Sequence, residues 1–148
     1  MSEDVTDALI RRLRSGDEGV ACKVAEIFKR APVTTDSMRA FLSDERNHLI
    51  VALMGEEMAG FVLGYELARL DAVAPMMFLY EIEVSLRYRR RGIGRALIGA
   101  LAQICLEKRF AKMLVMTDES NEAAMKLYAT TGAERPNRTD VLFNYRYR

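Results

Sequence analysis

Residues 76–95 read MMFLYEIEVSLRYRRRGIGR, an apolar strand pattern that runs into a glycine turn and a helix. The pattern predicts a strand at 76–84 and a helix over 92–106. A helix N-terminus already carries partial positive charge and unpaired N–H groups, so arginines there are unfavourable unless an anion binds. Glycines let the backbone approach phosphates closely, so this turn predicts a pyrophosphate site. The arginines that surround Gly92-Ile93-Gly94 are Arg87, Arg89, Arg90, Arg91 and Arg95.

Two common nucleotide motifs are excluded by the residues of this turn. A P-loop needs Lys and then Ser or Thr after its last glycine, but Arg95 and Ala96 follow Gly94. The dinucleotide-binding fingerprint needs a third glycine at the position of Leu97. Local chemistry alone therefore favours another phosphate ligand, with a solvated arginine cluster and a nucleic-acid site as the alternatives.

Composition is typical of a globular domain. The chain has 148 residues, of which 50% are hydrophobic, and we expect one domain over 1–148. A net charge of only +1 argues against nucleic-acid and membrane partners. Cys22 and Cys105 lack the spacing of a zinc site, so no metal is expected. Residues 1–10 lack a signal-peptide pattern, and the longest apolar run, 72–80, is too short to span a membrane; we expect a cytoplasmic protein.

Hydrophobic patterns over the rest of the chain predict a mixed α/β sheet. The predicted strands are 9–13, 49–54, 58–67, 76–84, 112–116 and 141–147. The predicted helices are 17–29, 36–42, 92–106 and 121–131, with Asp36 as an N-cap and Gly132 as a C-terminal stop. The strand–helix–strand unit over 76–116 should be parallel and right-handed. His48, the only histidine, is expected to be packed or solvent-facing rather than catalytic.

Two motifs carry a family resemblance. Arg89-x-x-Gly92-x-Gly94 resembles the acetyl-CoA pyrophosphate motif of GNAT N-acetyltransferases, and Asn121-x-x-Ala124-x-x-Leu127-Tyr128-x-x-x-Gly132 resembles their second signature. The resemblance implies the GNAT fold, a mixed, mostly antiparallel twisted sheet with a splayed central parallel strand pair, flanked by helices. It also implies acetyl-CoA as co-substrate. The implied cofactor-binding residues are Ile82, Glu83, Val84, Arg89, Arg90, Arg91, Gly92, Ile93, Gly94, Arg95, Asn121, Ala124 and Tyr128.

Within the superfamily, residues 65–132 look most like the aminoglycoside 3-N-acetyltransferases of the type I group. The stretch Tyr80-Glu81-Ile82-Glu83-Val84-Ser85 is similar to their Tyr-Asp-Leu-Ala-Val-Ser strand, with Glu81 in place of Asp. Asp118 and residues 124–128 also match. The basic tail, 133–148, is similar instead to ribosomal-protein alanine N-acetyltransferases. The resemblance therefore implies acetylation of an aminoglycoside at its 3-amino group. A peptide N-terminus or a ribosomal-protein alanine is the alternative acceptor, and a non-catalytic acyl-CoA sensor is a third reading.

Carboxylates on the strand 76–84 are the candidates for binding the amine. Even positions from Met76 to Val84 are apolar and should share one face, which leaves Glu81 and Glu83 on the other. A central strand is usually covered on both faces, so carboxylates there suggest a role in holding a cationic amine and taking its proton. Glu81 is the predicted base. The predicted substrate-binding residues are Tyr80, Glu81, Glu83, Asp118 and Glu119.

Further roles come from the resemblance alone. It implies that Tyr128 donates a proton to the departing thiolate, that the backbone N–H of Val84 polarises the thioester carbonyl, and that Asn121 holds the pantetheine arm. It also implies direct attack of the amine without a covalent intermediate. From the residues alone, Tyr128 could equally be a packed ring and Asn121 a helix cap. A homodimer is a further possibility.

Overall fold

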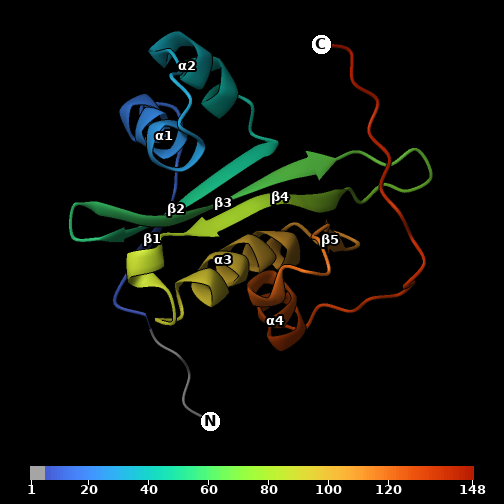
Figure 1. Ribbon diagram of the computed structural model, residues 1–148. Coiled ribbons are helices and arrows are strands. Elements are labelled where there is room, and N and C mark those ends of the chain that lie inside the picture. The colour runs from blue at the N-terminus through green and yellow to red at the C-terminus, as the bar shows by residue number, and fades with distance from the viewer. Residues whose placement is uncertain (1–5) are drawn as a thin grey trace. The chain divides into compact units, whose positions relative to one another are not determined.

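A five-stranded sheet in the order β1-β2-β3-β4-β5 forms the centre of the computed structural model, which describes residues 6–148 (Figure 1). Neighbouring strands are antiparallel from β1 to β4, whereas β4 and β5 are parallel. This is the mixed, mostly antiparallel sheet that the sequence predicts. The strands are β1 (Leu9–Arg12), β2 (Asn47–Met54), β3 (Glu57–Leu67), β4 (Met76–Val84) and β5 (Met113–Val115).

Helices cover both faces of the sheet. α1 (Glu18–Val24) continues into a π-helical segment, η1 (Ala25–Lys29), and these lie with α2 (Thr35–Ser43) on one face. α3 (Ile93–Glu107) lies on the other face (Figure 1). Apolar side chains explain both contacts. The α1–α2 face has a core that includes Leu13, Val24, Leu42, Val51 and Phe61, and α3 buries Ile93, Leu97 and Leu101.

The N-cap of α2 differs from the predicted one. The side chain of Thr34 accepts a hydrogen bond from the Ser37 N–H at 3.0 Å, so Thr34 is the cap. Asp36, the predicted cap, lies in the first turn, where it pairs with Arg39 at 2.6 Å. Thr and Asp are both good N-cap residues, so the sequence alone does not decide between Thr34 and Asp36.

Residues 117–148 form a second compact unit. Its helix, α4 (Glu122–Thr130), begins after Asn121, whose side chain accepts a hydrogen bond from the Ala124 N–H at 3.1 Å. Gly132 follows with a φ of +95°, as predicted for a C-terminal stop. The predicted strand at 141–147 does not form in the described part of the chain. Alternation of apolar and polar residues alone does not make a strand, because the backbone N–H and C=O groups of a strand need a partner strand.

The single histidine is packed in the interior, as expected. His48 is 0% exposed, and its Nε2–H donates to Glu66 Oε1 at 2.7 Å, an oxygen that also accepts from Lys108 Nζ at 2.6 Å. The carboxylate can only accept, so the proton lies on Nε2. Nδ1 is buried and makes no hydrogen bond within residues 6–148. Burial lowers the pKa of His48, which favours the neutral ring.

We expect acid to destabilise the fold through this buried ring. Because the folded-state pKa of His48 is lowered, its contribution to stability is complete above the ordinary value near ~6.5 and is lost below it, where only the unfolded chain takes up the proton. The free energy of unfolding should fall by up to about 1.4 kcal/mol per pH unit from this source. Urea unfolding of the wild type and His48→Gln from pH 7 to 5 measures it. Equal pH slopes in the two proteins would contradict a neutral buried His48.

Candidate active site

The arginine-rich turn presents backbone N–H groups at the start of α3. The short 3₁₀ turn η2 (Leu86–Tyr88) follows β4, and Arg90 and Gly92 then have positive φ angles of 62° and 75°. Gly92 is the N-cap of α3 rather than its first residue, and the first intrahelical hydrogen bond returns to its carbonyl at 3.0 Å. The N–H groups of Ile93 and Gly94 precede that bond, and no side chain caps the helix within the described residues. This geometry favours a bound anion.

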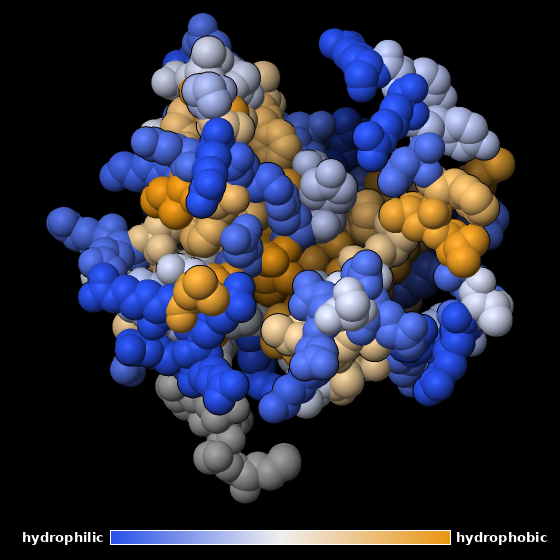
Figure 2. Space-filling model, in the orientation of Figure 1, coloured by the Kyte–Doolittle hydropathy of each residue, from blue (hydrophilic) through white to orange (hydrophobic). Residues whose placement is uncertain are grey.

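Arginine side chains surround this turn, and Tyr88 holds two of them in place. The Tyr88 hydroxyl donates to Glu57, which also pairs with Arg87 at 3.1 Å. The guanidinium carbons of Arg87 and Arg91 lie 5.3 and 5.5 Å from the centre of the Tyr88 ring. Arg89, Arg90 and Arg95 are exposed as well, and the surface over this end of β4 is largely hydrophilic (Figure 2). Several cations beside uncapped N–H groups fit a pyrophosphate.

β4 has an open edge just before this turn. Its parallel pairing with β5 ends at Leu79 and Val115, whereas β4 runs on to Val84. The Ser85 N–H donates to Ala59 O at 2.8 Å, which fixes the phase of the β3–β4 ladder. Backbone groups alternate along a strand, so those of Ile82 and Val84 point to the opposite, open edge. The Val84 N–H, which the resemblance assigns to the thioester carbonyl, therefore lies on this open edge.

A β-bulge at Tyr80 changes the face of every residue after it. Leu63 pairs with Glu81 and Gly64 with Leu79, so Tyr80 has no partner on β3. An extra residue shifts the alternation by one. The prediction that even positions share one face along the whole strand is therefore wrong. It fails because a bulge depends on the partner strand, which the pattern of β4 alone does not reveal.

The bulge brings both carboxylates of β4 to the face covered by α1 and α2. Lys29, the last residue of η1, donates a hydrogen bond to Glu81. This bond, together with the negative charges of Glu81 and Glu83, raises the pKa of Lys29. Met77, before the bulge, instead faces α3, since its sulfur lies 2.9 Å from where a Cβ on Gly64 would be. Tyr80, Glu81 and Glu83 thus lie near one ammonium, whereas the predicted alternation put Tyr80 on the opposite face from the two carboxylates.

The other predicted site residues lie in the second unit. Asp118 accepts hydrogen bonds from the backbone and hydroxyl of Ser120, which lower its pKa, and Glu119 pairs with Arg135 at 3.1 Å. Both carboxylates therefore have local partners. Asn121 is the helix cap of α4, and burial raises the pKa of Tyr128, which keeps the phenol protonated at neutral pH. Roles of these residues in catalysis and binding stay predictions.

Gly60 of β3 allows β3 and β4 to approach each other closely beside Val84, on the edge of β4 opposite the open one. A Cβ there would lie 2.7 Å from Glu83 O and 3.3 Å from Val84 Cα. We expect Gly60→Ala to lower the free energy of unfolding by about 1–3 kcal/mol. Gly99→Ala, in α3, is the matched control. A Cβ on Gly99 would meet nothing within 4 Å, and this substitution should raise the free energy of unfolding by about 0.5–1 kcal/mol. Urea unfolding measures the free energy of unfolding of both variants. A value for Gly60→Ala equal to that of the wild type would contradict the close approach.

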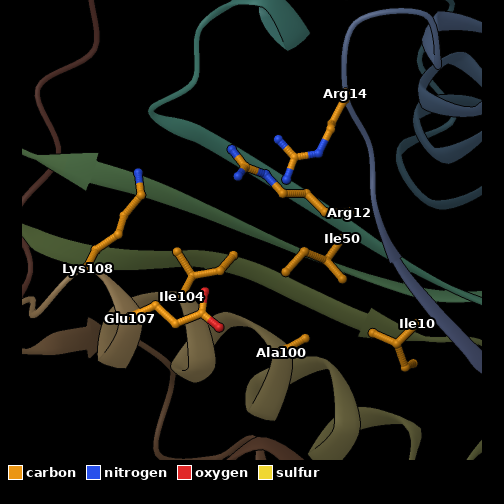
Figure 3. A pocket seen from close by; sticks show the side chains of 8 residues that line it. All are labelled: Ile10, Arg12, Arg14, Ile50, Ala100, Ile104, Glu107 and Lys108. Carbon is orange, nitrogen blue, oxygen red and sulfur yellow. The ribbon is translucent and has the colours of Figure 1, made fainter.

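A separate cavity of about 380 Å³ lies on the α3 face of the sheet (Figure 3). It is bounded by β1, β2 and the C-terminal half of α3, whereas the arginine-rich turn is at the N-terminus of that helix. Cationic, acidic and apolar side chains share its wall. The uncapped N–H groups of the turn lie at the other end of α3 and are not part of it. Its lining residues are Ile10, Arg12, Arg14, Ile50, Ala100, Ile104, Glu107 and Lys108.

Metal-ligand clusters and membrane-spanning helices are the two other features considered for the described residues. Across 6–148, no three His, Cys, Asp or Glu side chains gather as metal ligands would. None of the helices described is long and apolar enough to cross a membrane.

A family model and several known acetyltransferases match this chain. The family model described as "Acetyltransferase (GNAT) family" matches residues 13–133. The curated N-alpha-acetyltransferase 30 of Xenopus laevis is 26% identical over 151 residues, which cover 98% of this chain and 53% of that protein. The chain thus spans about half the length of that relative.

Solved structures share the fold. The aminoglycoside acetyltransferase meta-AAC0020, from an uncultured soil metagenomic sample and in complex with trehalose, superposes with a TM-score of 0.87 at 24% identity. The match covers 95% of this chain and 97% of that one. The ribosomal-protein-alanine N-acetyltransferase of Brucella melitensis biovar Abortus 2308 has a TM-score of 0.73 at 20% identity, covering 93% and 99% of the two chains.

Proposed function

Because this chain belongs to the acetyltransferase (GNAT) family, we propose that it transfers acetyl from acetyl-CoA to an amine of an aminoglycoside, at the 3-amino group, with residues 1–148 acting as one domain. The observation that carries the proposal is the pair of carboxylates, Glu81 and Glu83, on the same face of β4 beside Tyr80. An aminoglycoside presents several ammonium groups on sugar rings. Adjacent carboxylates attract the ammonium groups, and an aromatic ring packs against a sugar.

The turn between β4 and α3 supports acetyl-CoA as the co-substrate. The N–H groups of Ile93 and Gly94 would receive the pyrophosphate, with Arg89, Arg90 and Arg91 around it. The pantetheine arm would then lie along the open edge of β4. There it meets the backbone groups of Ile82 and Val84.

In the proposed transfer, the amine nitrogen attacks the thioester carbonyl carbon directly. A C–N bond forms and the C–S bond breaks. Glu81 takes the proton that the amine loses, and the Val84 N–H stabilises the oxygen on which negative charge develops. Tyr128 gives its proton to the departing thiolate; the raised pKa of this phenol keeps that proton in place until the thiolate forms.

A peptide N-terminus, including that of a ribosomal protein, is the second candidate acceptor. The relationship to an N-alpha-acetyltransferase over 98% of this chain favours it. A peptide amine carries one positive charge at its terminus, so it needs fewer carboxylates than a polycationic sugar. The acidic face of β4 therefore favours the aminoglycoside.

A coenzyme A-release assay against aminoglycosides, polyamines and peptides tests the proposal. We expect release with gentamicin-like compounds that have a free 3-amino group. Product mass and the position of the new amide then identify the acetylated nitrogen. Acetylation of peptides without acetylation of any aminoglycoside would favour the second candidate.

A further inference from the structure

The acceptor face is the face of β4 that α1 and α2 cover and that holds Glu81 and Glu83. Lys29 also lies on this face, which the sequence does not predict. It ends η1, and Arg30 then turns the chain with a φ of 50°. Its ammonium lies on Glu81, 52 residues further along the chain. The Lys29 side chain is 48% exposed and that of Glu81 22%, so the lysine reaches in from solvent onto a more buried carboxylate.

Aromatic rings adjoin this ion pair. Tyr80, directly before Glu81 in the sequence, lies 5.5 Å from the ring of Tyr65 and 5.8 Å from that of Phe78. Tyr65 in turn contacts Phe41 of α2 edge-on at 6.4 Å. The rings form a row from α2 across β3 to β4, on the face that holds Lys29. Carboxylates beside exposed aromatic rings suit a cation that is carried on an apolar or ring-shaped body.

We infer that Glu81 and this aromatic row form a cation subsite for the acceptor, and that Lys29 occupies it in the unliganded protein and leaves when the acceptor ammonium arrives. The inference rests on the proposed function, since it places the amine on this face. Two ammonium groups cannot occupy the same side of one carboxylate without repulsion. Lysine has a long, flexible stem and is half exposed, so it can swing into solvent at small cost.

This exchange makes Lys29 an internal competitor of the acceptor for Glu81. An acceptor with one ammonium replaces one cation on Glu81 by another, and gains little from the carboxylate. An acceptor with several ammonium groups also engages Glu83, which stands next to the pair. Every acceptor therefore has to displace Lys29, and one with several ammonium groups offsets that cost through Glu83.

The test compares Lys29→Met, which keeps the length but removes the charge, with Lys29→Arg, which keeps the charge. Lys23→Met is the control, because Lys23 is an exposed lysine of α1 and the change removes the same net charge. Calorimetry gives the dissociation constants of cyclohexylamine, a monoamine on an apolar ring, and of gentamicin. Coenzyme A release gives KM and kcat for gentamicin.

We expect Lys29→Met to bind cyclohexylamine about two- to fivefold more tightly, the effect of a partly exposed ion pair. Gentamicin affinity should rise by a similar factor, because gentamicin displaces the same lysine. Lys29→Arg and Lys23→Met should bind like the wild type. Unchanged or weaker cyclohexylamine binding in Lys29→Met would overturn the inference, as would the same gain in Lys23→Met.

Failure of the inference and failure of the proposed function are distinguishable. If the wild type acetylates gentamicin but Lys29→Met binds cyclohexylamine no better, the cation subsite is wrong and the function stands. If no aminoglycoside is acetylated but binding tightens in Lys29→Met alone, the subsite stands and the acceptor assignment is wrong.

Discussion

Replacing Glu81 with glutamine is expected to lower kcat/KM by about 10²–10⁴-fold while acetyl-CoA still binds. A protonated amine cannot attack a thioester, so a group beside it must take a proton before or during the attack. Glu81 lies on the acceptor face, three residues before Val84 on the open edge of β4. Glutamine has the same shape and still accepts a hydrogen bond from Lys29, but it cannot act as a base.

The pH–rate profile of Glu81→Gln beside the wild type checks this role, with acetyl-CoA affinity measured on the same protein. Glu56→Gln is the control, because it removes a carboxylate from the exposed turn between β2 and β3. Near-normal rates and an unchanged profile in Glu81→Gln would show that Glu81 is not the base. Glu83, the next carboxylate on the same face, or an ordered water would then be the candidate.

Replacing both glycines of the turn, Gly92→Val with Gly94→Val, should weaken acetyl-CoA binding by about 100-fold. Gly92 has a φ of 75°, which a β-branched residue adopts only with strain, so the turn has to change its shape. The N–H groups of Ile93 and Gly94 are then displaced or covered. Two hydrogen bonds to a charged phosphate correspond to a loss of about this size.

Titration calorimetry with acetyl-CoA measures that loss. Gly16→Val is the matched control, because Gly16 also has a positive φ, of 104°, but lies in the loop between β1 and α1. It should cost stability without changing affinity. Unchanged affinity in a folded double variant would remove the assignment of this turn.

Local sequence patterns were sufficient for the parts of the fold that depend on neighbouring residues. The apolar run of β4 predicted a strand over 76–84, which is where it lies. Apolar residues at helical spacing predicted α3 to within a residue at each end, with Gly92 as its cap instead of its first residue. The arginines and glycines between these elements predict an anion site by chemistry alone, and that site stays a prediction.

Features that depend on distant residues were not predictable in this way. The bulge at Tyr80 is a property of the pairing between β3 and β4, and the contact of Lys29 with Glu81 joins residues 52 apart. No motif near Lys29 marks it as part of the site. The alternation over 141–147 predicted a strand, but whether it forms depends on a partner outside that segment.

The candidate amine site stays a prediction, and the structure changes how its residues on β4 are grouped. Glu81 and Glu83 were predicted to share a face and do so, but Tyr80 was predicted on the opposite face and joins them only because of the bulge. Asp118 and Glu119 belong to the second unit, where each has a local partner. Their part in substrate binding stays a prediction.

The most direct test of the account is to follow the acetyl group itself. Acetyl-CoA with a ¹³C-labelled acetyl group is incubated with the protein and gentamicin, and the products are examined by NMR. We predict that the label appears as an amide on one amine nitrogen of gentamicin, and that the Glu81→Gln protein forms it far more slowly. Label that stays on coenzyme A, or that appears only as free acetate, would contradict transfer to this amine.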